Sequence, residues 1–367
     1  MTAPVPQNSQ ATARFTEYGV PIRNLWHMLL YAWNEAPLKG DWIRQDIENA
    51  PTLDALLASV LVKLMQQRLR IGLGREYVGQ AGLLRGIRGR IDFGESLRQH
   101  AFERGEAYSE YQGYSANEPG NQIIRTTLVR LARAGQFGLE ADPAKALRHR
   151  LRRLARDLDG IDLIELHPDL IHRQLSLRND RDYRLMLAIC ELILQRQMPL
   201  ESDGTSPLPA IDRDALILHN IYERFVANFC RVHLKGWEVT AQKRLEWPAR
   251  ESNEYLPQMV PDLLLQERSS GRVIVLDTKF TAHSLVETRW GKPVFDSSHL
   301  YQLYAYLKTQ DQLSEAHRTA MGILLYPAVG RHLSERIELP EHVIRIECID
   351  LAAPWPEIEA RLMDLAK

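Results

Sequence analysis

Two apolar segments joined by a short polar turn constrain the fold of this chain more than any other feature. Residues 259–265 contain Asp262, and residues 273–279 end in Asp277-Thr-Lys279. Continuous apolar runs are typical of strands that are covered on both faces. Charged groups in such strands are costly unless they are paired or bound to a metal ion. The alternative, a surface hairpin with solvated charges, predicts a polar residue at every second position, and the runs lack this alternation.

The turn between the two segments predicts which residues face each other. Residues 269–271 are Ser-Ser-Gly, which suits a hairpin loop. A hairpin centred between the two serines places Asp262 opposite Asp277, and opposed residues have Cβ atoms roughly 4.5–5.5 Å apart. Lys279 lies two positions after Asp277 and therefore shares its face. We predict that two carboxylates and one ammonium group converge.

This convergence predicts a metal site. Two carboxylates this close repel each other, so that one holds a proton unless a cation lies between them. Oxygen ligands suit Mg²⁺, for which Mn²⁺ can substitute, rather than zinc. Such an ion polarises a phosphate and lowers the pKa of a bound water molecule, while Lys279 would orient that water or balance charge on phosphorus. The pattern resembles the metal and phosphate site of PD-(D/E)xK nucleases.

Two flanking segments are expected to complete the site. Residues 215–229 have apolar side chains spaced by four, which predicts a helix with a buried stripe. The resemblance implies that Glu223 on this helix is a further metal ligand, although a solvated Glu223 paired with Arg224 is an equal alternative. Residues 299–307 predict a second helix, on which Gln302 could bind the scissile phosphate or a water molecule.

Composition bounds the class of protein. The chain has 367 residues, enough for two domains, and a net charge of −1. A nuclease that acts alone usually needs a positive surface, so the basic surface is local or a partner holds the DNA. No P-loop sequence occurs, and we expect no nucleotide to be bound by the chain's own motifs.

The cysteines and the hydropathy pattern indicate a compartment. The three cysteines are far apart and form no Cys-x-x-Cys motif, which fits a reducing, cytoplasmic environment without disulfides or structural zinc. The first fourteen residues lack the apolar region of a signal peptide. No run of about 18 apolar residues, which a membrane-spanning helix needs, occurs in the sequence. We therefore expect a cytoplasmic protein that does not contact the membrane.

The first half of the chain has a mixed pattern. Residues 22–33 and 52–65 predict helices, whereas residues 77–93 predict strands interrupted by glycines. Arg88 and Arg90 alternate with glycines, which would let the backbone approach another surface closely. We interpret these arginines as a contact for a partner protein, with a twisted edge hairpin carrying solvated arginines as an equal alternative.

The Pro/Ser/Gly-rich residues 199–209 predict a linker between two domains. The expected fold is α+β or α/β: a mixed α/β partner-binding domain over residues 1–200, then a PD-(D/E)xK restriction-endonuclease-like domain over residues 210–367. The second domain should have a mixed central sheet flanked by helices. Residues 1–14 are expected to be disordered, and an earlier boundary near residue 160 is an alternative.

The whole chain resembles the McrC family, the nuclease subunits of McrBC modified-cytosine restriction systems. The segments that carry the resemblance occur in the family's order and are residues 21–33, 86–93, 117–127, 245–247, 275–280, 300–303 and 324–327. The resemblance implies catalytic roles for Asp262, Asp277 and Lys279, and double-stranded DNA as the substrate. It also implies a hexameric McrB-like AAA+ GTPase partner, whose GTP hydrolysis the amino-terminal region stimulates by entering the ring.

Two other functions remain open from the sequence. The chain could be an adaptor that activates an AAA+ ring and carries a vestigial nuclease, although the intact acidic pair and Lys279 argue against degeneration. It could also be an autonomous DNA nuclease, although near-neutral charge without a reading module gives a poor hold on DNA. The leading hypothesis is a Mg²⁺-dependent endonuclease subunit driven by its partner.

Overall fold

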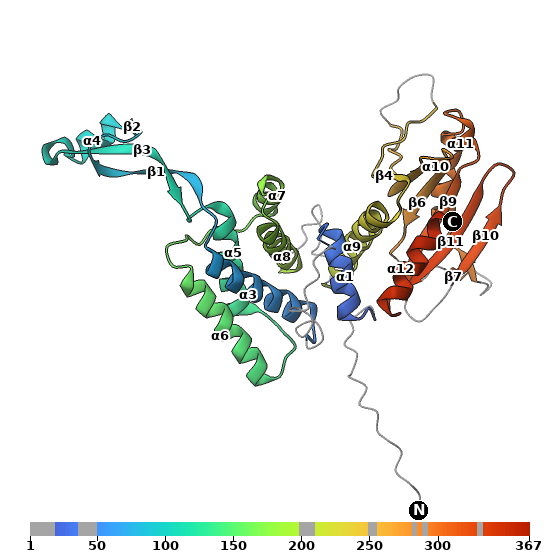
Figure 1. Ribbon diagram of the computed structural model, residues 1–367, viewed down its shortest axis with the longest axis horizontal. Coiled ribbons are helices and arrows are strands. Elements are labelled where there is room, and N and C mark those ends of the chain that lie inside the picture. The colour runs from blue at the N-terminus through green and yellow to red at the C-terminus, as the bar shows by residue number, and fades with distance from the viewer. Residues whose placement is uncertain are drawn as a thin grey trace, which may run out of the picture. The chain divides into compact units, whose positions relative to one another are not determined.

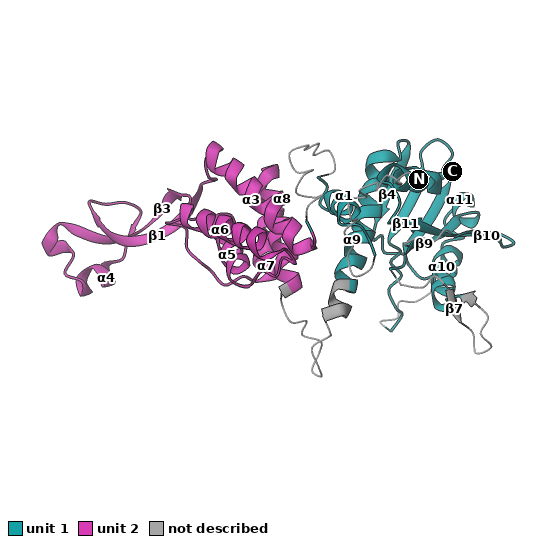
Figure 2. Ribbon diagram, turned by 90° about the horizontal axis from the view of Figure 1, so that it is seen from below, with its two compact units in different colours: residues 1–50, 199–367 teal, residues 51–198 magenta. Residues whose placement is uncertain are grey.

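The computed structural model describes residues 19–35, 50–197, 210–248, 255–280, 285–287, 293–328 and 333–367. The chain divides into two compact units, which Figure 2 colours separately. Unit 1 comprises residues 1–50 and 199–367, and unit 2 comprises residues 51–198. No helix in the described ranges is long and apolar enough to span a membrane. Residues 1–14 and the linker 199–209 lie outside the described residues.

Unit 1 is built on a six-stranded sheet in the order β10-β11-β9-β6-β5-β4 (Figure 1). Strand β9 runs parallel to β6 and β11, and the other neighbours are antiparallel. This mixed sheet with flanking helices confirms the predicted class. Its strands are β4 (Trp237–Ala241), β5 (Leu263–Glu267), β6 (Val273–Thr278), β9 (Met321–Ala328), β10 (Ser334–Glu338) and β11 (Val343–Asp350).

The remaining elements of unit 1 are mostly helices. A separate two-stranded sheet pairs β7 (Leu285–Glu287) with β8 (Pro293–Phe295). The helices are α1 (Ile22–Ala32), α9 (Ala210–His233), α10 (Ser297–Thr309), α11 (Glu315–Arg318), α12 (Trp355–Met363) and the 3-10 turn η2 (Asp364–Ala366). Both helices expected around the hairpin are therefore present, as α9 and α10.

Helix α10 packs tightly on one face of the sheet. Leu303 and Leu307 belong to a buried cluster with side chains of β5, β6, β9 and β11. Gly322 of β9 permits this approach, because a Cβ atom there would lie 2.9 Å from side-chain atoms of both leucines. Asp277 pairs with Leu324 of the same cluster, so its side chain shares the face that α10 covers.

Helix α1 corrects the expected extent of the amino-terminal domain. It packs against α9 of unit 1, where Tyr31 contacts the rings of Phe225 and Phe229. The buried Asn24 donates to the carbonyl oxygens of Leu351 at 2.8 Å and Ala353 at 2.9 Å. Residues 1–200 are therefore not one domain, because the apolar face of α1 is buried by the carboxyl-terminal half.

Unit 2 combines a helical body with a long β arm. Helix α8 packs on α3, α5 and α7, so the unit continues past residue 160 and the alternative boundary there is not observed. The helices are α3 (Leu53–Ile71), α4 (Phe93–Arg98), α5 (Pro119–Ala134), α6 (Ala141–Asp157), α7 (Pro168–Leu177) and α8 (Arg181–Gln197), with a 3-10 turn η1 (Phe102–Arg104). The strands are β1 (Glu76–Arg85), β2 (Arg90–Ile91) and β3 (Glu106–Ser115).

The strand pairing in the arm differs from the local hairpin that the sequence suggested for the segment around Arg88 and Arg90. Strands β1 and β2 do not pair with each other but lie on opposite sides of β3, which occupies the centre. Figure 1 shows β1 and β3 projecting from the helices, with α4 at the far end. Gly89, at a φ of 72°, passes so close to β3 that a Cβ atom there would lie 2.1 Å from the Glu110 carbonyl oxygen.

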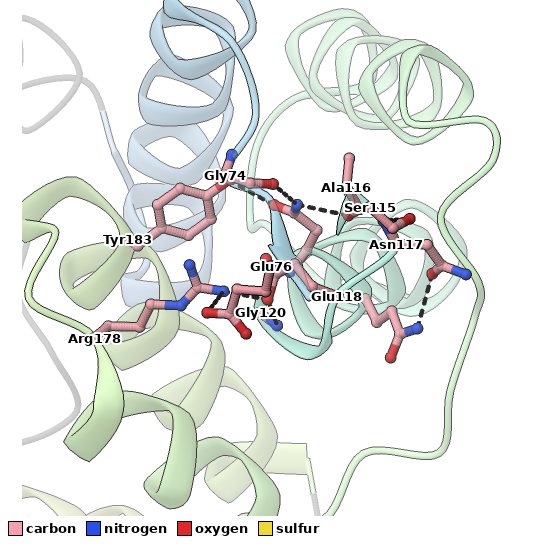
Figure 3. A network of polar contacts seen from close by, with 11 residues as sticks. Gly74, Glu76, Ser115, Ala116, Asn117, Glu118, Gly120, Arg178 and Tyr183 are labelled. Carbon is pink, nitrogen blue, oxygen red and sulfur yellow. Dashed lines mark hydrogen bonds and ion pairs between the residues drawn. The ribbon is translucent and has the colours of Figure 1, made fainter. Parts of the chain in front are cut away.

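A buried polar network fixes the base of the arm to the helices (Figure 3). Glu118 is fully buried, accepts from the backbone N–H groups of Gly120 and Asn121 at the start of α5, and pairs with Arg178. Arg178 also lies 3.2 Å from Glu76 of β1. Burial raises the pKa of Glu118, and the charge of Arg178 opposes that rise. The network therefore links β1 to the start of α5 and to the end of α7.

Candidate active site

The observed hairpin has the predicted register. Leu263 of β5 pairs with Leu276 of β6, and the pairing continues to Gln266 and Val273. The same register places Asp262 opposite Asp277, at the end of the hairpin away from its turn. The strands form as expected because both segments are continuous apolar runs, and β6 is buried along its whole length.

Asp277 and Lys279 come together with Gln302 of α10. Asp277 is 2% exposed, and its Oδ2 atom lies 2.7 Å from Lys279 Nζ. This contact is an ion pair between the buried carboxylate and the ammonium group. Lys279 Nζ donates to Gln302 Oε1 at 2.7 Å, and Gln302 Nε2 donates to the Tyr306 hydroxyl at 2.7 Å. Helix α10 therefore positions the ammonium group through Gln302.

A second chain of polar contacts joins Asp262 to Glu223. Asp262 Oδ2 accepts from the backbone N–H of Thr278 at 2.7 Å and from its hydroxyl at 2.5 Å. Gln242, immediately after β4, donates through Nε2 to Glu223 Oε1 and lies 3.5 Å from Asp262 Oδ1. Glu223 of α9 is thus connected to the acidic pair through Gln242 rather than placed alone on a solvated face.

The carboxylates perturb one another as the sequence predicted. Burial, followed by the charge of Asp262, raises the pKa of Asp277 from 3.8 to about 6, and Lys279 opposes this rise. Burial and the charge of Asp262 also raise the pKa of Glu223. Mutual repulsion disfavours full ionisation of Asp262, Asp277 and Glu223, and a divalent cation would relieve it. In the described residues, however, the ligand atoms of these three carboxylates do not all lie within 4.8 Å of one another.

Sequence reasoning missed Gln242 and Thr278. Gln242 has a φ of 52°, a left-handed conformation that is uncommon for a residue other than glycine. Its backbone N–H also donates to the Asp262 carbonyl at 3.0 Å, which closes the turn around the site. No motif marks Gln242, and the role of Thr278 follows only from its contacts with Asp262 in the folded chain.

Arg88 and Arg90 lie in unit 2 and do not belong to this group. The Arg88 guanidinium lies 4.5 Å from the centre of the Tyr111 ring and 3.4 Å from the Gln112 carbonyl oxygen. Arg90 pairs in β2 with Glu110 of β3. Both side chains are exposed on the arm, where their role as a partner contact remains a prediction.

Another group of possible metal ligands lies at the opposite end of α10. Ligand atoms of Asp311, Glu341 and His342 all lie within 4.8 Å of one another. Lys308 Nζ, however, pairs with Asp311 Oδ2 at 2.6 Å and also with Glu341. His342 Nε2 lies 3.0 Å from Asp311 Oδ1. Internal cations already satisfy these carboxylates, so this group serves as an ion-pair network joining α10 to β11.

Comparison with known proteins assigns the family. A sequence model described as "McrBC 5-methylcytosine restriction system component" matches residues 7–327. The chain is 28% identical over 350 residues to the "Type IV methyl-directed restriction enzyme EcoKMcrBC" of Escherichia coli (strain K12), covering 94% of this chain and 97% of that protein. Its fold is similar to a chain in the solved assembly of Thermococcus gammatolerans McrB AAA+ hexamers with bound McrC, with a TM-score of 0.53, 17% identity, and coverage of 94% of this chain and 76% of that chain. These matches confirm the resemblance seen in the sequence, and the chain belongs to the McrBC restriction-system family, on its McrC side.

Proposed function

We propose that this chain is the DNA-cleaving subunit of a McrBC-type restriction system. It would hydrolyse phosphodiester bonds in double-stranded DNA with Mg²⁺, as a PD-(D/E)xK endonuclease. The observation that carries this proposal is the convergence of Asp262, Asp277, Lys279 and Gln302 at one end of the hairpin, with Glu223 joined to it. These groups come from four separate elements, which a solvated surface hairpin would not bring together.

The donor set fits a hard divalent cation. Asp277 is 2% exposed and lies opposite Asp262 across the hairpin, so two carboxylates face the place where an ion would bind. Asp262, Asp277 and Glu223 would hold the ion, and carboxylate oxygens favour Mg²⁺ or Mn²⁺. When bound, such an ion supplies Lewis-acid activation of the phosphate and of a water molecule.

Lys279 and Gln302 would act on the attacking water and on the phosphate. The Lys279 ammonium group lies 2.7 Å from both Asp277 Oδ2 and Gln302 Oε1, so its position is fixed from two sides. From there it can orient a water molecule and stabilise the negative charge that develops on the phosphoryl oxygens. Gln302 also contacts Tyr306, which anchors the amide to the buried face of α10.

A McrB-like hexameric AAA+ GTPase is the proposed partner. The similarity to McrC bound to McrB AAA+ hexamers supports this choice, as does the absence of a P-loop sequence in this chain. Unit 2 would engage the ring and stimulate GTP hydrolysis through its arm, where Arg88 and Arg90 are exposed. The arm also exposes Ile87, Phe93 and Leu97 by more than 60%, which favours a protein contact over a solvated hairpin.

Active-site variants test the proposed chemistry. Asp262→Ala, Asp277→Ala and Lys279→Ala should each lower DNA cleavage by the assembled complex at least a hundredfold. GTP turnover by the partner should still be stimulated, because the changes lie in unit 1. Plasmid cleavage and GTP turnover are measured on the same preparations, with Arg336→Ala as a surface control. Normal cleavage by any of the three variants contradicts the assignment of these residues to the active site.

The same experiment separates the alternative functions. An adaptor with a vestigial nuclease would stimulate GTP turnover, while the wild-type complex would leave the plasmid intact. An autonomous nuclease would cut efficiently with Mg²⁺ and without any partner. The near-neutral charge of the chain argues against efficient unaided cutting at physiological salt, although it permits weak DNA binding at low salt.

A further inference from the structure

A groove on unit 1 opens beside the candidate active site. Its cavity volume is about 530 Å³, and the lining includes Glu223 and Gln242 of the candidate site. The rest of the lining comes mainly from one face of α9, which presents Asn220, Arg224 and Arg231. The groove is therefore continuous with the acidic group, and its wall carries cationic side chains.

The two arginines of this wall have no carboxylate partner among the described residues. Arg224 is exposed, and within these residues it makes neither an ion pair nor a hydrogen bond. Arg231 donates to Asn228 Oδ1 at 2.6 Å, and Asn228 in turn donates to the Tyr31 carbonyl oxygen at 2.9 Å. Arg231 is thus held in place by a neutral amide that is anchored to α1, and its charge is not neutralised.

We infer that this groove is a track for the phosphate backbone of duplex DNA, with Arg224 and Arg231 as its phosphate contacts. The two residues are seven positions apart on α9, which places them on one face about 10.5 Å apart along the axis. A guanidinium group can donate two parallel hydrogen bonds to a phosphate, which fixes the register of the strand.

Electrostatics supports the same assignment, which rests on the proposed function. The acidic group alone repels a phosphate backbone, and the net charge of −1 provides no general attraction for DNA. Arg224 and Arg231, neither of which forms an ion pair within the part of the chain that the structure describes, offset that repulsion locally, and the charge of Arg224 opposes the rise that burial causes in the pKa of Glu223. Some exposed arginines elsewhere in unit 1 are paired instead, for example Arg318 with Glu315 and Arg336 with Glu338.

The test is DNA binding by the full chain across a salt series. A fluorescently labelled 30-base-pair duplex is titrated in EDTA, so that no cleavage occurs, and anisotropy is measured from about 20 to 200 mM KCl. Arg224→Ala with Arg231→Ala should weaken binding on the order of tenfold and reduce the slope of log K against log salt by about 1.8. Arg224→Lys with Arg231→Lys should retain most of that slope, because lysine keeps the charge.

The matched control is Arg318→Ala with Arg336→Ala, which removes the same charge from exposed, paired positions of the same unit. Its slope should equal that of the wild type. An equal loss of slope in both double variants overturns the inference, and so does wild-type binding too weak to detect at 20 mM KCl. Arg224→Ala alone, which breaks no described contact, should lower the slope by about 0.9 and guards against a folding defect.

A negative result for the groove can be distinguished from a failure of the proposed function. Cleavage by the wild-type complex decides the proposed function, whatever the binding slopes are. If the wild-type complex cuts DNA and Arg224→Ala with Arg231→Ala does not raise its KM for DNA, the track is wrong and the nuclease assignment stands. If the slopes change as expected but the complex never cuts, the groove binds DNA and the catalytic proposal is wrong.

Discussion

Asp277 connects the stability of unit 1 to its chemistry. Burial and the charge of Asp262 raise its pKa from 3.8 to about 6. At pH 3 to 4 the residue is protonated in the folded state, and its contribution to stability is present. As the pH rises through 6, the folded protein must ionise a buried carboxyl group, and this contribution is lost. The loss is on the order of 3 kcal/mol in the metal-free protein.

Asp277→Asn should remove this pH dependence. Between pH 4.5 and pH 7.5 in EDTA, the wild type should lose stability relative to the variant, because the substituted amide cannot ionise. Thermal unfolding of both proteins at the two pH values measures how much more stability the wild type loses than the variant. The contributions of titrating groups that behave alike in both proteins cancel in this difference. Mg²⁺ should restore stability at pH 7.5 to the wild type and much less to the variant. If the variant loses as much stability as the wild type between these pH values, the pKa of Asp277 is not raised.

The sequence predicted the residues of the hairpin because their geometry is local. The distance of Asp262 and Asp277 from the turn sets their pairing, and the strand repeat sets the side on which Lys279 lies. Gln302 was also identified, although its contact with Lys279 depends on the packing of α10. Gln242 could not be predicted, because its position depends on the pairing of β4 with β5 and on its left-handed backbone.

At the scale of elements, the contact between α10 and the sheet sets the position of Gln302. Gly322→Ala should push α10 outward, since the new Cβ atom would lie 2.9 Å from Leu303 and Leu307. Overpacking of this kind costs about 1–3 kcal/mol. Cleavage should fall with it, because Gln302 would withdraw from Lys279.

Chemical denaturation and cleavage by the assembled complex measure both effects of Gly322→Ala. Gly82→Ala is the matched control, because no heavy atom lies within 4 Å of the added Cβ atom on strand β1. Its stability should change by less than about 1 kcal/mol, in keeping with an open strand position. Full stability and full cleavage in Gly322→Ala would show that the approach of α10 is not critical.

The base of the arm offers a test within unit 2. Glu118→Ala removes the partner of the nearly buried Arg178 and the acceptor for two backbone N–H groups of α5. Breaking a buried ion pair costs about 3–5 kcal/mol. Glu118→Gln keeps an acceptor oxygen and should cost less, while Glu103→Ala on the exposed surface should change stability by under about 0.5 kcal/mol. Denaturant unfolding that gives equal losses for all three variants would refute the role of the network.

The arm itself could not be predicted from local pattern. Strand β3 is largely polar in sequence, and its first partner β1 lies across α4 and η1 in the chain. Hairpin signals describe neighbouring strands, so the segment with Arg88 and Arg90 suggested a local hairpin. The real pairing places β3 between β1 and β2, which only long-range contacts decide.

At the scale of the whole molecule, unit 2 is an insertion between α1 and α9 of unit 1. The compositional change near residue 200 predicted where unit 2 ends, within a residue or two. It did not predict that residues before 50 belong to unit 1, because a helix's apolar stripe does not identify its partner. The buried side chains of α1 include Ile22, Leu25, Trp26, Met28 and Leu29.

This arrangement predicts how the chain can be divided. A fully buried large side chain contributes about 1.5–3 kcal/mol, so the α1 face contributes roughly 10 kcal/mol, comparable with the stability of a whole domain. Residues 199–367 alone should therefore be unstable, with the apolar face of α9 uncovered. Residues 1–50 joined to residues 199–367 by a short Gly/Ser linker should fold and gain thermal stability from Mg²⁺. Residues 51–198 alone should unfold in one cooperative transition. Circular dichroism melts of the three fragments measure this, and equal melting of the two unit 1 fragments would show that α1 does not belong to the core of unit 1.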